Sequence, residues 1–116
     1  HTNYLLNISD KIISLDISKN AINSAKKKNI KNAEFHNNII EKFKTNEKID
    51  LIIASEVVYY IKDIKKFIEN IERFKTNYII TYYSYENHKL DKYFTHSNYH
   101  IEIFSAYGQK WFIIFK

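Results

Sequence analysis

The sequence predicts an α/β fold with a mostly parallel sheet, and three observations support this. Strand-like and helix-like segments alternate along the chain, which is typical of parallel strands joined by crossover helices. Residues 49–55 (IDLIIAS) form a continuous apolar run, as expected for a strand of a parallel sheet covered on both faces. Two apolar stretches flank Tyr107-Gly108-Gln109, so the chain's one glycine lies where a C-terminal antiparallel hairpin needs its turn.

The first half of the chain contains a helix tail, a strand, a helix and a second strand. Apolar residues within 2–7 are compatible with the end of a helix, and residues 11–15 (KIISL) are strand-like. Residues 16–29 predict a helix with Ser18 as its N-cap. The lysines near its end are favoured by the helix dipole. Residues 33–37 (AEFHN) predict the second strand.

The second half repeats this alternation and ends in the hairpin. After the strand at 49–55, isoleucines at three- and four-residue spacing predict an amphipathic helix over 61–74. Residues 77–83 (NYIITYY) predict a further strand. Residues 86–94 (ENHKLDKYF) are ambiguous between a short helix and a connection, and residues 99–116 contain the two hairpin strands.

Composition limits the classes of protein open to this chain. Its 116 residues are enough for one domain, and 45% hydrophobic and 16% aromatic residues favour a folded body. It has no cysteine, which excludes disulfides and cysteine-bound zinc, and no apolar run approaches a membrane span of about 20 residues. The net charge of +5 comes from lysines spread along the chain, so nucleic-acid binding is disfavoured. We expect a cytoplasmic protein.

Polar residues follow the predicted strands at the ends where open parallel sheets bind ligands. They are Asp16, Asn37, Asn38, Ser55, Glu56, Ser84 and Glu86. An acid at position 16 can accept both hydroxyls of a ribose through charge-assisted hydrogen bonds. It can equally cap the helix that follows, where the dipole favours an acid. The residues alone leave both roles open.

Four segments together resemble the class I S-adenosylmethionine-dependent methyltransferases: ISLDIS, FHNNIIEKF, IDLIIASEVVYYI and IITYYS. The SEVVYYI segment is most similar to the nodulation-type N-methyltransferases. The resemblance extends from Asn3 to Lys116 and implies a Rossmann-like methyltransferase sheet with S-adenosyl-L-methionine as cofactor.

The resemblance implies roles for five cofactor-binding residues. Asp16 would hold the ribose hydroxyls, and Ile17 would lie against the adenine. Asn38 stands where the family usually has an acid facing the adenine amino group, and an amide oxygen can still accept that bond. Ile39 would contribute its backbone amide, and Ser55 would line the floor near the methionine part.

The resemblance also places the methyl acceptor near Glu56, Tyr59 and Tyr60. Glu56 would bind an ammonium or take a proton from the acceptor, although an acid here can also be a helix-start residue. The two tyrosines would lie over the same pocket, or would be rim and core aromatics.

The start of the chain departs from the family. Such enzymes begin with a strand and a glycine-rich G-x-G-x-G turn, whereas HTNYLL looks like the helix that follows that turn. We therefore expect residues 1–116 to be one methyltransferase domain that is N-terminally incomplete. The absent strand would lie between residues 11–15 and 49–55, and its absence puts the activity of this chain alone in doubt.

Three histidines near the hairpin could suggest a metal site. They are His88, His96 and His100. Their spacing fits no standard ligand motif, and no cluster of acids accompanies them. Surface or packing histidines are the favoured interpretation, and we expect no metal.

The predicted function is methyl transfer from S-adenosylmethionine to an amine or hydroxyl of a small molecule or saccharide. One alternative is a non-catalytic Rossmann-like module that binds a partner chain, which an incomplete cofactor site and an exposed strand edge would favour. A less favoured alternative is a basic nucleic-acid-binding domain that uses lysine and tyrosine.

Overall fold

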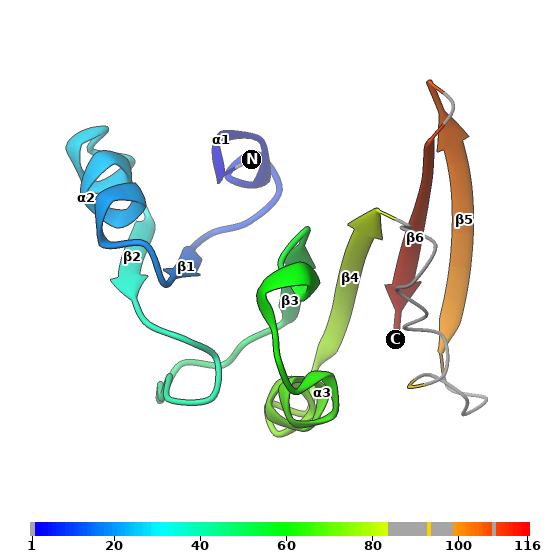
Figure 1. Cartoon of the computed structure of the whole chain (residues 1–116). Coiled ribbons are helices and arrows are strands. Elements are labelled where there is room, and N and C mark those ends of the chain that lie inside the picture. Colours follow the sequence, from blue (N-terminus) through cyan, green and yellow to red (C-terminus); the bar gives the residue numbers. More distant parts are fainter. Residues whose placement is uncertain (1, 84–92, 94–98, 108) are drawn as a thin grey trace. The chain divides into compact units, whose positions relative to one another are not determined.

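The structure, a computed structural model, describes residues 2–83, 93, 99–107 and 109–116. It divides into two compact units, residues 1–45 and 46–116. Each unit is treated by itself below, with the element labels of Figure 1. The predicted single domain spanning both units stays a prediction.

The first unit contains a two-stranded parallel sheet and two helices. In chain order its elements are α1 (Thr2–Leu5), β1 (Ile12–Asp16), α2 (Lys19–Lys27) and β2 (Ala33–Asn37). The strands pair in register from Ile12 opposite Ala33 to Asp16 opposite Asn37. The Ser18 side chain caps α2 by accepting the Ala21 N–H at 3.2 Å, which confirms the predicted N-cap.

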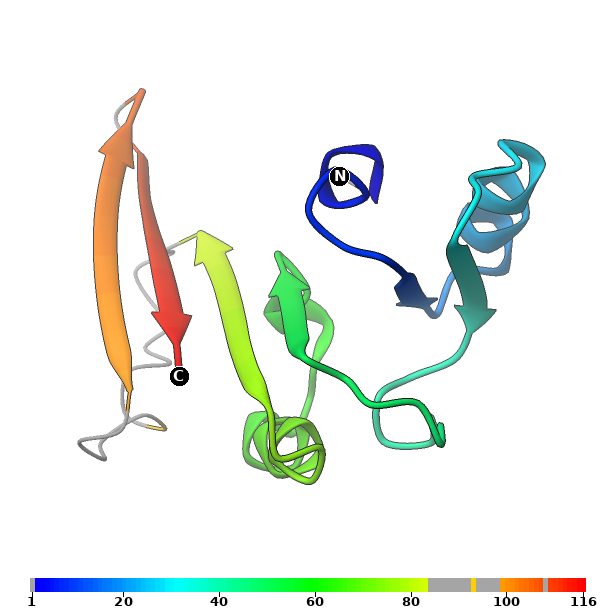
Figure 2. The same ribbon diagram turned by 180° about the vertical axis from the view of Figure 1, so that it is seen from behind.

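The second unit contains a four-stranded mixed sheet. Its elements are β3 (Leu51–Ser55), the 3-10 turn η1 (Val58–Tyr60), α3 (Ile64–Glu72), β4 (Asn77–Tyr83), β5 (His100–Ala106) and β6 (Gln109–Phe115). The strand order is β3-β4-β6-β5 (Figures 1 and 2), with β3 parallel to β4 and the other pairs antiparallel. Parallel strands, crossover helices and a C-terminal hairpin confirm the predicted α/β class.

The core of the second unit is built from α3 and alternate residues of the sheet. The inward residues of α3 are Phe67, Ile68 and Ile71, all buried. On β4 every second residue is buried, namely Tyr78, Ile80 and Tyr82. Full burial of an aliphatic or aromatic side chain is worth about 1.5–3 kcal/mol, so these two rows anchor the unit and fix the position of the strand ends.

One expectation about β3 is wrong. Its apolar run predicted coverage on both faces, but Leu51 and Ile53 are 44% and 41% exposed, whereas Ala54 is only 7% exposed. Within the second unit, no described element covers the face that carries Leu51 and Ile53. Among the described residues β3 pairs only with β4, and β1 only with β2. The prediction that a strand belongs between β1 and β3 stays a prediction.

Among the described residues, positions other than glycine make the tight turns. Five of them have the left-handed backbone that glycine usually supplies: Asn29, Asn32, Glu56, Lys75 and Tyr107. Asparagine tolerates this conformation, but for most other residues it costs about 1–2 kcal/mol. Three of the five turns are therefore made by residues that pay a steric penalty, and one of those is the predicted site residue Glu56 with φ 56°.

Some predictions concern residues outside the described ranges. These are the strand-end residues Ser84 and Glu86, the ambiguous segment 86–94 except Tyr93, the histidines His88 and His96, and the turn glycine Gly108. In the described part of the chain, no helix has the length and apolar character needed to cross a membrane.

Candidate active site

Asp16 ends β1 with an exposed carboxylate at the start of α2. Its Oδ1 accepts the backbone N–H of Ser18 at 2.7 Å. Among the described residues, no donor contacts Oδ2. One oxygen thus serves the helix start, as the capping interpretation requires, and the second is available to a ligand, as the ribose interpretation requires.

Asn37 fixes the backbone that follows Asp16. From the end of β2, its side-chain Nδ2 donates to the carbonyl of Asp16 at 3.0 Å and to the carbonyl of Ile17 at 2.9 Å. The N–H of Asn38 also donates to the Asp16 carbonyl, at 3.2 Å. The turn between β1 and α2 is therefore held by its neighbouring strand, with the Ile17 side chain 68% exposed. The sequence placed Asn37 at a strand end but gave it no role.

Asn38 and Ile39 are bonded to each other. The Asn38 Oδ1 accepts the Ile39 N–H at 2.9 Å, so the two groups that the resemblance assigned to the adenine satisfy one another. An amide oxygen has a second lone pair and the Asn38 NH₂ has two donors. The side chain of Asn38 keeps hydrogen-bonding capacity, while the Ile39 N–H is occupied.

In the second unit, Glu56 extends the β3–β4 pairing by one residue and then reverses the chain. Its N–H donates to the Thr81 carbonyl at 2.9 Å, and its φ of 56° turns the backbone out of the strand. The Thr81 hydroxyl lies 3.3 Å from Glu56 Oε1 and 3.1 Å from the Ser55 hydroxyl. Strained backbone conformations of non-glycine residues are concentrated at functional sites. The positive φ of Glu56 therefore supports the end of β3 as a candidate functional site.

Tyr59 contacts the other oxygen of the same carboxylate. Its hydroxyl donates to Glu56 Oε2 at 2.8 Å, lies 3.1 Å from the Tyr83 carbonyl and accepts the Tyr83 N–H. Tyr60 is 79% exposed, and its ring stands nearly perpendicular to that of Tyr59 with the centroids 6.4 Å apart. Tyr59 is therefore committed to the protein, whereas Tyr60 is open to solvent.

The structure thus brings the predicted residues together in two groups. Asp16, Ile17, Asn38 and Ile39 lie together in the first unit, and Ser55, Glu56, Tyr59 and Tyr60 in the second. Sequence reasoning missed Thr81 as a site residue. The β3–β4 register, in which Ser55 is opposite Thr81, is the signal that identifies it, because parallel neighbours end at the same edge of a sheet.

A half-buried carboxylate with a neutral hydroxyl on each oxygen is an anion whose charge is not cancelled by a cation. Such a group can accept a hydrogen bond from an ammonium, or take a proton from a nucleophile as it reacts. No group of three or more metal-ligating side chains exists in the described residues. Of the three histidines near the hairpin, His100 lies in the described residues, where it contacts Glu102 Oε1 at 3.3 Å and packs near the Phe115 ring.

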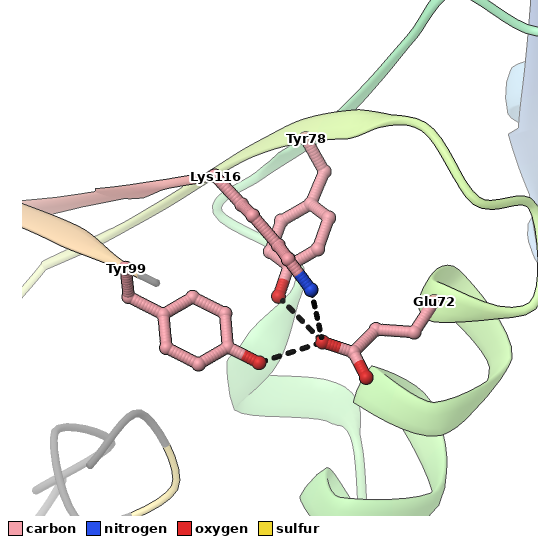
Figure 3. A network of polar contacts seen from close by, with 4 residues as sticks. All are labelled: Glu72, Tyr78, Tyr99 and Lys116. Atoms are coloured by element: carbon pink, nitrogen blue, oxygen red, sulfur yellow. Dashed lines mark hydrogen bonds and ion pairs between the residues drawn. The ribbon is translucent and has the colours of Figure 1, made fainter. Parts of the chain in front are cut away.

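A second carboxylate–tyrosine cluster lies in the second unit, away from Glu56 along the sequence (Figure 3). Oε1 of Glu72, at the end of α3, accepts from the Tyr99 hydroxyl at 2.6 Å, the Tyr78 hydroxyl at 3.2 Å and the Lys116 ammonium at 3.3 Å. An open cavity of about 540 Å³ is lined by Glu72, Tyr78, Lys116 and residues 75–77. Another, of about 390 Å³, lies between α2 and β2. Neither is lined by a predicted site residue.

The family comparison covers nearly the whole chain. A family model described as "Methyltransferase domain" matches residues 2–111. No curated protein sequence matches the chain.

Several solved structures share the fold. The N-methyltransferase NodS from Bradyrhizobium japonicum WM9, solved with S-adenosyl-L-homocysteine, is 15% identical with a TM-score of 0.75, covering 98% of this chain and 69% of that one. A DhpI–SAH complex is 12% identical with a TM-score of 0.76, covering 99% and 70%. An rRNA methylase from Streptococcus thermophilus is 15% identical with a TM-score of 0.70, covering 99% and 78%.

At these identities the solved structures support the fold, and the family model supports the membership. Together they confirm the class that the four sequence segments indicated. The chain belongs to the methyltransferase-domain family and is a class I S-adenosylmethionine-dependent methyltransferase.

Proposed function

We propose that this protein transfers a methyl group from S-adenosylmethionine to an amine or hydroxyl of a small molecule or saccharide, with Glu56 at the acceptor. The observation that supports this best is the Glu56 carboxylate at the end of β3, held by hydroxyls on both oxygens and unpaired with any cation among the described residues. In a member of the methyltransferase-domain family, such a group is suited to a nucleophile that arrives protonated or becomes acidic as it reacts.

The cofactor half of the proposal rests on the end of β1 and its neighbours. Asp16 offers Oδ2 to the ribose hydroxyls while Oδ1 stays with Ser18. Exposed Ile17 offers an apolar surface to the adenine. Asn38 offers its remaining donors and acceptor to the adenine edge. Ile39 serves by holding Asn38 rather than by offering its own N–H.

The residues proposed for the methionine part of the cofactor and for the acceptor belong to the second unit. Exposed Ser55 lines the methionine part of the cofactor, whose sulfonium supplies an electrophilic methyl when bound. Glu56 binds the acceptor ammonium, or receives the proton that a neutral nucleophile loses. Tyr60 contacts the acceptor through its exposed ring. Much of the rate of methyl transfer comes from alignment of the acceptor with the methyl group and the sulfur.

The cofactor assignment is tested by calorimetry on the complete protein with S-adenosylmethionine. Asp16→Ala should weaken binding by about 1.5–3 kcal/mol, the range for hydrogen bonds to a charged group, which corresponds to roughly 10- to 150-fold. Asp16→Asn should lose less, because its amide oxygen still accepts. Unchanged affinity in both variants would leave Asp16 as a cap of α2 only.

The acceptor is tested with three matched sugars and labelled cofactor. Glucosamine offers an amine and hydroxyls, N-acetylglucosamine lacks the free amine, and glucose has hydroxyls only. Methylation confined to glucosamine supports an amine acceptor, and methylation of all three supports a hydroxyl. Since one structural relative is an rRNA methylase and the net charge is +5, ribosomal RNA is included as a fourth acceptor. Labelling of RNA alone would overturn the small-molecule proposal.

The non-catalytic alternative makes a different prediction. In the same calorimetric titration, a Rossmann-like interaction module would bind neither S-adenosylmethionine nor S-adenosylhomocysteine. A cytoplasmic location stays part of the proposal and is checked by cell fractionation.

A further inference from the structure

The hydroxyl of Tyr59 joins the Glu56 carboxylate to the end of β4. A phenol carries one proton to donate and lone pairs to accept. Here the hydroxyl accepts the Tyr83 N–H, and two acceptors lie within reach of its single proton: Glu56 Oε2 at 2.8 Å and the Tyr83 carbonyl at 3.1 Å. The carboxylate is both nearer and charged, and charge-assisted hydrogen bonds are the stronger ones. The proton therefore goes to Glu56.

Two further contacts restrain the same residue. Oε1 of Glu56 is within reach of the Thr81 hydroxyl at 3.3 Å, and the Glu56 N–H is bonded to the Thr81 carbonyl at 2.9 Å. Glu56 also has a positive φ, 56°, at this corner of the sheet. With each oxygen and the backbone held, rotation of the carboxylate is limited. The restraint from Tyr59 is the shorter of the two on the side chain.

We propose that Tyr59 is a positioning residue, which acts on the acceptor through Glu56 by fixing the direction in which that carboxylate faces. This inference rests on the proposed function and deepens it. It assigns different roles to Tyr59 and Tyr60, which the sequence analysis placed together near the acceptor. The exposed Tyr60 meets the acceptor, whereas Tyr59 has its hydroxyl engaged by Glu56 and the backbone of Tyr83.

The test is Tyr59→Phe, which keeps the ring and removes the hydroxyl, in the complete protein with S-adenosylmethionine and glucosamine. We expect kcat to fall about tenfold, since small losses of alignment carry large rate penalties, with the KM for S-adenosylmethionine unchanged within about twofold. Because Tyr59 acts through Glu56, the double variant Tyr59→Phe/Glu56→Gln should lose no more than Glu56→Gln alone.

Tyr78→Phe is the matched control, because it removes a phenol from the other carboxylate, Glu72. It should leave turnover per folded molecule at the wild-type value. A fall in turnover equal to that of Tyr59→Phe would show that loss of any such phenol slows the enzyme, and would overturn the specific role of Tyr59.

The remaining outcomes separate the two proposals. Wild-type kcat in Tyr59→Phe, or losses that multiply in the double variant, overturn the positioning role and leave the proposed function standing. A wild-type protein that binds no S-adenosylmethionine and methylates no sugar overturns the proposed function and this inference with it. If Tyr59→Phe yields no folded protein, Thr81→Val frees Oε1 instead. The kcat of Thr81→Val should then fall, because the Glu56 carboxylate has lost one of its restraints. An unchanged kcat overturns the claim that restraint of the carboxylate sets the rate.

Discussion

Two carboxylate–tyrosine clusters in one unit differ in the groups that surround each carboxylate. Glu72 receives two phenols and the Lys116 ammonium on a single oxygen (Figure 3). Glu56 receives neutral hydroxyls, one on each oxygen. A carboxylate that pairs with a cation of the protein has its charge neutralised by that pair. A carboxylate that contacts only hydroxyls can still attract a cation from a ligand. The first arrangement suits structure and the second suits binding.

The electrostatics of the Glu72 cluster agree with a structural role. The hydrogen bond from Tyr99 is the main cause that holds the pKa of Glu72 below its usual value of 4.5, with Lys116 acting in the same direction against burial. Burial is the main cause that raises the pKa of Tyr78 above 10.0, and it also raises the pKa of Tyr99. The cluster joins the end of α3 to the starts of β4 and β5 and the end of β6, so it fixes the hairpin on the unit.

The largest effect that separates the clusters is expected in turnover. Glu56→Gln keeps the shape and removes the charge, and turnover should fall tenfold or more, toward the range of about 10²–10⁴ found for general acid–base groups. Glu72→Gln should leave turnover per folded molecule intact. Methyl transfer at saturating S-adenosylmethionine, divided by the folded fraction from circular dichroism, measures both.

The opposite pattern would break the comparison. If Glu56→Gln turns over normally but melts at a lower temperature, Glu56 is a helix-start acid worth a few tenths to about 1 kcal/mol. The acceptor-binding group would then have to be sought at Tyr60. Cofactor titration of both variants serves as the control, because the proposed ribose and adenine contacts are made by other residues.

Local patterns predicted the elements of this fold, and pairing between distant segments accounts for what was missed. The strands at 33–37 and 77–83 have the predicted bounds, and Ser18 caps α2 as expected. Glu56 was found because it follows an apolar run. Its positive φ was not predicted, since the one glycine of the chain lies elsewhere and nothing local marks a glutamate as left-handed.

The Glu72 cluster shows why some contacts stay out of reach of sequence reasoning. Glu72 and Tyr78 lie in α3 and β4, Tyr99 directly precedes β5, and Lys116 directly follows β6. The pairing of β4 with β6 and of β6 with β5 brings these four residues to one end of the sheet. The amphipathic pattern of α3 predicts that Glu72 lies near a helix end. It carries no information on which strands meet that end, because register depends on turns and on residues far along the chain.

The second prediction uses pH to sharpen the comparison. The lowered pKa of Glu72 means that its contribution to stability is present above pH 4.5 and is lost as the pH falls through its folded pKa. The raised pKa values of Tyr78 and Tyr99 act in the opposite sense, so their contribution is present below pH 10.0 and is lost as the pH rises through their folded values.

Chemical unfolding of wild type and Glu72→Gln across pH tests this. The variant should be less stable by about 1 kcal/mol between these limits, a value discounted because the Glu72 side chain is 36% exposed. The two curves should converge toward acid pH, where the wild-type carboxyl also becomes protonated. A difference that stays constant from pH 3 to 8 would contradict an ionised Glu72 and leave packing as the cause.

The smallest expected effect concerns the backbone at the same two places. Lys75 follows α3 with φ 51°, and Glu56 follows β3 with φ 56°. Relief of the steric penalty, about 1–2 kcal/mol, is partly offset by the flexibility of glycine in the unfolded chain, about 0.5–1 kcal/mol. Lys75→Gly should therefore raise the free energy of unfolding by about 0.5–1 kcal/mol, because the Lys75 N–H keeps its bond to the Glu72 carbonyl.

Glu56→Gly relieves a similar penalty but should bring no net gain, because it also removes the contacts with Tyr59 and Thr81. Alanine at each position isolates the backbone contribution, since the glycine and alanine variants lack the same side-chain contacts. In urea unfolding, the glycine variant should have a higher free energy of unfolding than the alanine variant at each position. The difference should be similar at both positions, near 1 kcal/mol. Only at position 56 should both variants lose turnover. Equal turnover in Glu56→Gly and wild type would mean that the strained residue is a turn and nothing more, and the two clusters would then differ in charge but not in function.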